Sequence, residues 1–228
     1  MTFVAEGPKV VGELLQAGIF DVLEIFALPT WVEEVYTASG NSIADHVQLI
    51  TPVELDRISS LTTPHDVVAV FSQKKENELT HTAQGITLVL DEIKDPGNLG
   101  TLIRTAHWFG VDQIICSSGT VDQYNSKVVQ STMASLGKVP LYYINDLHDW
   151  LAAGRKKPLL AATLNGQPLP SCELKKDVCI MIGNESAGIN PALLEIADMH
   201  LTIPQIGDAE SLNAAVSGAI ILYHFTSI

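Results

Sequence analysis

The sequence predicts an α/β protein in which a parallel β-sheet carries helices on both faces and a smaller α/β domain comes first. Apolar runs of strand length alternate with helix-like patterns throughout residues 85–228. These runs are apolar at consecutive positions, which is typical of parallel strands buried on both faces. The most polar stretch of the chain, SQKKENELTHTAQG at residues 72–85, separates them from a differently patterned first part. We therefore expect domains at residues 1–80 and 85–228.

The first part of the chain predicts a compact accessory domain. Pro29 is placed to begin a helix directly after a strand, and Thr51 is a capping residue followed by proline at the first helical position. The expected elements are a helix at 9–17, a strand at 22–27, a helix at 29–37, a strand at 45–50, a helix at 51–59 and a strand at 67–71.

The second part alternates more clearly. Asn190 followed by proline predicts the start of one of its helices. The expected strands lie at 86–91, 113–116, 141–144, 159–164, 178–183 and 199–203. The expected helices lie at 98–109, 126–136, 146–153, 190–197 and 212–225. The last of these helices is strongly apolar, so it either packs within the subunit or serves a dimer.

Composition restricts the function. The 228 residues carry 13 Lys and Arg against 26 Asp and Glu, a net charge of −13. Proteins that coat nucleic acid nonspecifically are normally basic, so an RNA ligand would have to be held by a few local cations. The 3 cysteines form no CxxC pair, which argues against a zinc site or a disulfide framework. Cys116 and Cys179 lie in apolar runs and are expected to be buried.

No signal points to a membrane or to export. No apolar run is long enough to span a bilayer, and the start MTFVAEGPKVV has an acid at Glu6 and no basic segment before its apolar residues. We expect a cytoplasmic protein.

Three loops carry the residues suited to chemistry. They follow expected strands at 91–100 (DEIKDPGNLG), 183–188 (GNESAG) and 204–211 (PQIGDAES). Ligands of parallel α/β sheets bind at the carboxyl ends of the strands, where these loops lie. Each loop by itself is more typical of a turn that feeds a helix, but three together favour a binding site.

Several common nucleotide and hydrolase motifs are absent. The loop after residues 86–91 has only Gly97 and Gly100, without the GxGxxG pattern or a following acid for a ribose. The sequence has no GxxxxGK[ST], GxSxG or HExxH, and its seven histidines show no metal-ligand spacing. We expect no metal site.

Long segments resemble one family. LDEIKDPGNLGTLIRTAHWFGVDQIICS (90–117), IMIGNESAGI (180–189) and LTIPQIGDAESLNAAVSGAIILYHF (201–225) are similar, in order, to the three signatures of the SpoU/TrmH branch of SPOUT RNA methyltransferases. VVQSTMASLGKVPL (128–141) is similar to the Ser-rich helix before a proline in that family. FVAEGPKVVGELL (3–15) resembles the start of its accessory substrate-binding domain, which is similar to an RNA-binding ribosomal-protein fold.

The resemblance implies a function and an architecture. It implies transfer of a methyl group from S-adenosyl-L-methionine to a ribose 2′-hydroxyl of RNA, either rRNA or tRNA. It also implies a C-terminal trefoil knot, an N-terminal domain that binds RNA, and a homodimer. It implies neither a membrane nor a metal ion.

The same resemblance assigns site residues. The implied catalytic residues are Asn98, Arg104, Glu185, Ser211 and Asn213. The implied cofactor contacts are main-chain groups at Gly183, Ile203 and Leu212. From the residues alone, Gly183 is equally well explained as a bend after a strand. The alternative for Glu185 is an acid at a helix entry, which the residues favour less.

Arg104 has two interpretations. Composition alone favours a surface ion pair from this helix residue to Asp95 or Glu92. The resemblance favours a catalytic role, in which the guanidinium stays protonated, grips an RNA phosphate and polarises the 2′-hydroxyl. The proton acceptor would be that phosphate or water. Asn98, Ser211 and Asn213 would then orient the ribose and Arg104, and Glu185 would hold Asn98, Arg104 or a loop amide.

Two basic clusters are candidates for the RNA grip, Lys74–Lys75 and residues 155–157, although both are also typical of solvated loops. Two other functions stay open at this point. One is a non-catalytic RNA-binding protein that retains the fold, and the other is a nucleotide-dependent oxidoreductase with an atypical loop. Titration with each cofactor separates the three.

Overall fold

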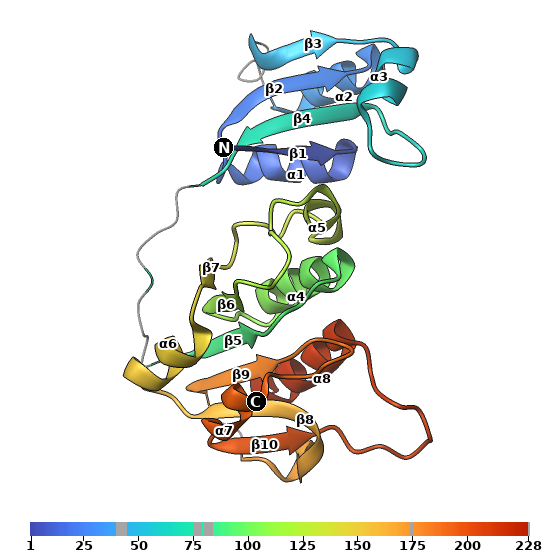
Figure 1. Ribbon diagram of the computed structural model, residues 1–228. Coiled ribbons are helices and arrows are strands. Elements are labelled where there is room, and N and C mark those ends of the chain that lie inside the picture. The colour runs from blue at the N-terminus through green and yellow to red at the C-terminus, as the bar shows by residue number, and fades with distance from the viewer. Residues whose placement is uncertain (40–44, 75–78, 80–83, 174–175, 228) are drawn as a thin grey trace.

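A computed structural model describes residues 1–39, 45–74, 79, 84–173 and 176–227. Two sheets organise these residues, one of four strands and one of six (Figure 1). Among the helices of the described residues, none is long and apolar enough to cross a membrane.

The first half of the chain folds around the four-stranded sheet. Its elements are β1 (Thr2–Glu6), α1 (Pro8–Ala17), β2 (Val22–Ala27), α2 (Pro29–Ser39), β3 (Val47–Leu49), α3 (Pro52–Ile58) and β4 (Val67–Ser72). The strand order is β1-β4-β2-β3, with β4 antiparallel to both of its neighbours. The six elements expected from the sequence are present, with ends that differ by a few residues.

Two details of this half concern the sequence predictions. Thr51 forms the expected cap, and it does so as a capping box in which Glu54 accepts a hydrogen bond from the Thr51 main-chain N–H at 2.8 Å. Strand β1 was not predicted. It has only five residues, and its place in the sheet depends on pairing with β4, so the local sequence gives too short a pattern.

The second half folds around the six-stranded sheet, whose order is β10-β8-β9-β5-β6-β7. Every neighbouring pair is parallel, as the sequence predicts. The strands are β5 (Ile86–Leu90), β6 (Gln113–Ser117), β7 (Leu141–Ile144), β8 (Leu159–Pro168), β9 (Val178–Ile182) and β10 (Met199–Thr202). The helices are α4 (Pro96–Trp108), α5 (Ser126–Ser131), α6 (Leu147–Gly154), α7 (Pro191–Glu195) and α8 (Ala214–Thr226), with a 3₁₀ turn, η2, at Leu169–Ser171.

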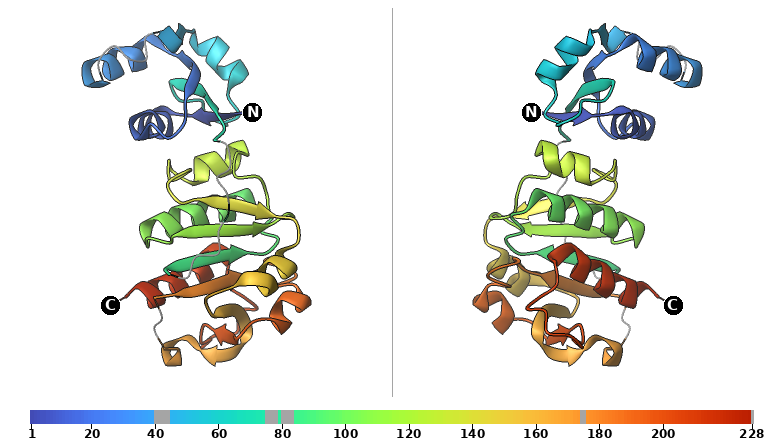
Figure 2. Two further views of the ribbon diagram at one scale, coloured as in Figure 1. Left: turned by 90° about the vertical axis from the view of Figure 1, so that its left-hand side faces the viewer. Right: turned by 90° about the vertical axis from the view of Figure 1, so that its right-hand side faces the viewer.

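Helices cover both faces of this sheet (Figure 2). Leu88 and Leu90 of β5 point into a core shared with α4 and α8. Val89, between them, points into a second core shared with α6 and α7. This alternation explains why every residue of β5 is buried.

Two elements of this half differ in length from the prediction by about four residues or more, and the others differ by less. Helix α5 ends at Ser131 rather than continuing to residue 136, because Met133 (φ 46°) and Ala134 (φ 63°) adopt the left-handed conformation. Strand β8 continues to Pro168 beyond the predicted 164, since β10 pairs with its far end at Leu201↔Gln167.

Candidate active site

The three polar loops lie at one edge of the six-stranded sheet. They follow β5, β9 and β10, and all three strands are parallel, so their carboxyl ends meet at the same edge. Strands β5 and β9 are direct neighbours. Residues that lie far apart in the sequence are thereby brought to one place.

Hydrogen bonds tie the first two loops together. The Asn184 side chain donates to the Glu92 carbonyl at 2.9 Å, and its oxygen accepts from the main-chain N–H of Ser186 at 2.9 Å. The buried Asp91 carboxylate accepts from the Asn190 N–H at 2.8 Å. Asn184 and Asp91 both lie within the polar loops, yet neither is assigned a role from the sequence. A side chain that shapes a loop has no sequence signal of its own.

The centre of the site is a chain of three side chains. The Asn213 amide donates to the Asn98 side-chain oxygen at 2.8 Å, and the Asn98 amide donates to the Glu185 carboxylate. These residues come from the third, first and second signature respectively. Three of the five predicted catalytic residues are therefore in direct contact.

Helix starts hold two of these residues in place. Asn98 lies in the first turn of α4, where the Asp95 side chain accepts its N–H at 2.8 Å. Asn213 is the N-cap of α8, and its side-chain oxygen accepts from the N–H of Ala215 at 2.9 Å and of Val216 at 3.3 Å. With its oxygen used by the cap, Asn213 presents its amide N–H₂ to Asn98.

Arg104 is exposed on α4, and it forms no ion pair or hydrogen bond within the described residues. The two acids considered as its partners are engaged elsewhere. Asp95 caps α4, and Glu92 pairs with Lys94 at 2.9 Å. The surface ion pair is therefore not formed, and the guanidinium is available to a ligand.

The remaining predicted residues lie at the same carboxyl ends of the strands, but they are not part of the Asn213–Asn98–Glu185 chain of side chains. Ser211 is exposed, and no hydrogen bond links it to Asn98, Glu185 or Asn213 in the part of the chain that the structure describes. Leu212 precedes the cap of α8 and is 47% exposed. Ile203 follows β10 and packs against the main core.

Gly183 has an internal reason to be glycine. A Cβ at this position would lie 2.4 Å from the main-chain carbon of Gly188 and 2.4 Å from the nitrogen of Ile189. The second loop folds back on its own start, and Asn184 and Gly188 exchange main-chain hydrogen bonds of 3.0 and 2.9 Å. A larger residue at 183 would deform this loop, whether or not a ligand is present.

The cluster at residues 155–157 is used for structure. Arg155 pairs with Asp198. Lys157 is 4% exposed and donates to the Gly85 carbonyl at 2.9 Å and the Thr87 hydroxyl at 2.8 Å, and burial lowers the pKa of its ammonium group. Both residues precede β8, so they lie at the amino end of this strand, on the side of the sheet opposite the candidate site. Of the second candidate cluster, Lys75 lies outside the described residues.

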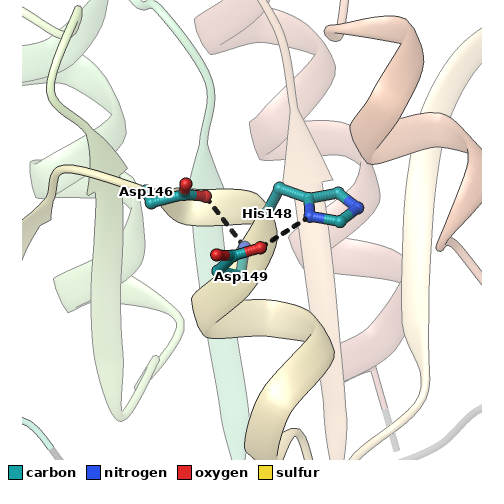
Figure 3. A group of neighbouring side chains, drawn as sticks. All are labelled: Asp146, His148 and Asp149. Atoms are coloured by element: carbon teal, nitrogen blue, oxygen red, sulfur yellow. Dashed lines mark hydrogen bonds and ion pairs between the residues drawn. The ribbon is translucent and has the colours of Figure 1, made fainter.

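Asp146, His148 and Asp149 lie close together at the start of α6 (Figure 3). Asp146 is the N-cap of this helix, accepting from the Asp149 N–H at 2.9 Å, and His148 Nδ1 lies 3.2 Å from Asp149. All three are exposed. Helix capping accounts for this arrangement.

The chain is similar to known methyltransferases along its whole length. It is 32% identical over 231 aligned residues to the Bacillus subtilis protein named 23S rRNA (guanosine(2553)-2'-O)-methyltransferase, covering 98% of this chain and 88% of that protein. A TrmH-family structure from Porphyromonas gingivalis superposes with a TM-score of 0.85 at 33% identity, covering 99% of this chain and 90% of the other. A structure of an AdoMet-bound rRNA methyltransferase from Sinorhizobium meliloti gives 0.81 at 29% identity, covering 98% and 86%.

The three signatures, the chain of side chains that they form and the whole-length similarity agree with one another. The family model described as SpoU rRNA Methylase matches residues 85–223, which include every residue of the candidate site. The chain belongs to the SpoU rRNA methylase family.

Proposed function

We propose that the protein transfers a methyl group from S-adenosyl-L-methionine to a ribose 2′-hydroxyl of RNA. The observation that carries this proposal is the Asn213–Asn98–Glu185 chain at the carboxyl ends of the strands. Helix α4 bears both Asn98 and Arg104, and Arg104 has no ion pair or hydrogen bond within the described residues. Family membership and the relatives described above support it. The Bacillus subtilis relative further supports large-subunit ribosomal RNA as the substrate, which would place the activity in the cytoplasm.

The residues present fit the proposed cofactor. The main-chain N–H and C=O of Leu212 have no partner among the described residues, and this residue lies beside Asn213. Together with Ile203 and Gly183 it would hold the cofactor through main-chain groups and apolar surface. When bound, S-adenosyl-L-methionine supplies an electrophilic methyl group on a sulfonium.

The side chains of the site would act on the RNA. Arg104 would bind the phosphate beside the target ribose and polarise its 2′-hydroxyl, since a guanidinium offers a planar pair of donors to phosphate. Asn98, held between Glu185 and Asn213, would orient the ribose, and Ser211 would contribute from the third loop. Alignment of this kind can account for most of the rate enhancement of a group transfer.

We further infer a homodimer. Helix α8 buries one side against the core through residues such as Gly218, Ile221 and Leu222. Its opposite side is an exposed apolar stripe of Val216, Ile220 and Tyr223, which the exposed Leu212 extends just before the helix begins. A second copy of this helix is the partner that we propose for the stripe, since large exposed apolar surfaces are typical of interfaces. One side of α8 thus packs within the subunit, and we infer that the other side serves the dimer.

We also infer the trefoil knot and the two domains at residues 1–80 and 85–228. Strand β10 is an outermost strand of the sheet. The segment after it nevertheless returns to the loop after the central strand β5, where Asn213 meets Asn98. A knotted path would account for this return. The separate four-stranded sheet supports an N-terminal unit that contributes to RNA binding.

The test of the activity is transfer of radiolabelled methyl to ribosomal RNA isolated from cells that lack this gene. We expect label in the large-subunit RNA at a nucleotide that resists alkaline cleavage, as a 2′-O-methylated position does. Tight binding of RNA without transfer would instead support a non-catalytic RNA-binding protein. Binding of a nicotinamide cofactor in place of S-adenosyl-L-methionine would support the oxidoreductase.

A further inference from the structure

A short segment of the second half lies between the two sheets. This bridge segment, residues 123–137, includes α5, and Figure 1 shows α5 between α1 and β1 on one side and α4 on the other. Val129 is part of the core of the N-terminal sheet, whereas its neighbour Val128 is part of the core of the six-stranded sheet. Consecutive residues of one helix thus belong to different cores.

Contacts on the N-terminal side are extensive. The ring centroid of Tyr124 lies 5.1 Å from that of Phe3 and 6.3 Å from that of Phe20. The Tyr124 hydroxyl accepts from the Lys74 N–H at 3.3 Å, and the Gln130 side chain donates to the Glu6 carbonyl at 3.0 Å. These contacts hold the start of the bridge segment and α5 against β1 and the end of β4.

The end of the bridge segment is shaped for the same contact. Gly137 lies so close to the N-terminal half that a Cβ would stand 2.7 Å from the Phe20 ring and 2.9 Å from the Ile19 side chain. Before it, Met133 and Ala134 are both left-handed, a conformation that residues with a Cβ adopt only where packing enforces it. Ala134 is buried in the N-terminal core, so that packing is present.

Contacts on the other side reach the catalytic helix. A Cβ at Gly100 of α4 would lie 2.4 Å from Ser131 Cβ and 2.8 Å from the Val128 carbonyl oxygen, so the two helices touch through their backbones. His107 Nδ1 of α4 lies 3.2 Å from the Ser135 hydroxyl. Helix α4 also bears Asn98 and Arg104. Packed atoms therefore connect Phe3 and Phe20 to the helix that carries the proposed catalytic residues.

The solved relatives support a fixed arrangement. The superpositions reported above cover 98–99% of the chain, both sheets together, with TM-scores of 0.81 and 0.85 at 29% and 33% identity. Two sheets joined by a freely moving linker would not keep one relative position across proteins this different in sequence.

We propose that the bridge segment fixes the N-terminal half to α4 before RNA binds, so that it determines which nucleotide reaches Arg104. Tyr124 is a positioning residue in this device. The proposal rests on the proposed function, because the N-terminal half would hold RNA at a set distance from the site of methyl transfer. A rigid arrangement selects its target by geometry and leaves less freedom to be lost on binding.

The first experiment needs no RNA. Small-angle scattering of the full chain and of Tyr124→Ala compares their maximum dimensions, and calorimetry compares their affinity for S-adenosyl-L-methionine. We expect a larger maximum dimension for Tyr124→Ala and a cofactor affinity within twofold of the unmodified protein. An unmodified protein as extended as the variant would overturn the proposal, even if methyl transfer is confirmed.

The second experiment measures methylation of ribosomal RNA. For Tyr124→Ala we expect a tenfold or greater rise in the KM for RNA, a kcat within threefold, and label at additional nucleotides. Tyr124→Phe, which keeps the ring and loses the hydroxyl that accepts from the Lys74 N–H, should stay close to the unmodified protein. Unchanged KM and unchanged target, or equal losses of cofactor affinity and kcat, would contradict the positioning role.

A variant that does not fold and an unmodified protein without activity lead to different conclusions. If Tyr124→Ala does not fold, Gln130→Ala removes the partly buried side chain that donates to the Glu6 carbonyl, and it carries the same expectations with a smaller rise in KM. If the unmodified protein transfers no methyl group to any RNA, the proposed function fails, whereas the scattering comparison still decides whether the two halves are fixed.

Discussion

Asn213 and Asn98 are 115 residues apart in sequence, yet the Asn213 amide donates to the Asn98 side-chain oxygen at 2.8 Å. This bond joins the start of α8 to the start of α4. It also determines which way the Asn98 amide is turned, because its oxygen faces Asn213 and its N–H₂ faces the Glu185 carboxylate. The orientation of one side chain in the site therefore depends on both of its neighbours.

Asn213→Asp separates this role from helix capping. Aspartate still caps α8, so we expect the free energy of unfolding to change by less than about 0.5 kcal/mol, whereas Asn213→Ala should lose about 1 kcal/mol. Methyl transfer by Asn213→Asp should fall roughly tenfold or more, because the Asn98 oxygen loses its donor and turning the amide would face that oxygen to Glu185. Chemical denaturation and single-turnover methylation measure the two effects. Full activity in the aspartate variant would show that the bond is dispensable.

Arg104→Ala tests the proposed catalytic cation. Because Arg104 has no partner within the described residues, we expect an unchanged melting temperature and an unchanged affinity for S-adenosyl-L-methionine. Methyl transfer should fall on the order of a hundredfold, and Arg104→Lys should recover little, since a point charge lacks the planar pair of donors. Single-turnover methylation at saturating cofactor is the measurement. A folded Arg104→Ala protein with near-normal turnover would refute the role.

Two glycines inside helices should respond oppositely to alanine. At Gly100 the new Cβ would meet Ser131 and the Val128 carbonyl, so we expect Gly100→Ala to destabilise the protein by about 1–3 kcal/mol. At Gly12 of α1 a Cβ would meet nothing within 4 Å, so Gly12→Ala should stabilise it by about 0.5–1 kcal/mol. Thermal unfolding of both variants compares them. Equal effects at the two positions would contradict the close approach of α4 and α5.

The three cysteines should resist thiol reagents in the folded protein. Cys116, Cys172 and Cys179 are all buried and free, and burial raises the pKa of each thiol. A raised pKa keeps the thiol protonated to higher pH, so raising the pH from 7 to 9 should produce little of the reactive thiolate. Ellman's reagent should detect almost no thiol in the native protein and three after denaturation. Rapid reaction of one thiol in the native protein would contradict the burial of that side chain.

The exposed stripe of α8 gives a test of the homodimer. Val216→Glu places a charge in the stripe, where Val216 is 48% exposed, and should convert a dimer into a monomer. Val53→Glu is a matched control, since Val53 of α3 is 63% exposed and lies in the other half. Light scattering at micromolar concentration should report half the mass for the first variant and no change for the second. The same mass for all three proteins would argue against this interface.

Much of the fold follows from local sequence. The parallel character of the sheet was predictable because largely apolar runs such as those of β5 and β9 alternate with helix patterns, and every residue of both strands is buried. Thr51, Asn190 and the prolines after them marked helix starts that the structure confirms. Strand β1 and the end of α5 were mispredicted for one reason. Both are determined by contacts with distant residues, β1 by pairing with β4 and the turn at Met133 by packing against the N-terminal sheet.

The sequence by itself determined which residue types stand at the carboxyl ends of the strands, and its resemblance to a family assigned them roles. Only the tertiary structure decided which of them meet. It joined Asn213, Asn98 and Glu185, left Arg104 without a partner among the described residues, and placed Arg155 and Lys157 at the opposite edge of the sheet. The physical reason is that hydrogen bonds and ion pairs act over a few ångströms, while the order of strands in a sheet brings together segments separated by a hundred residues.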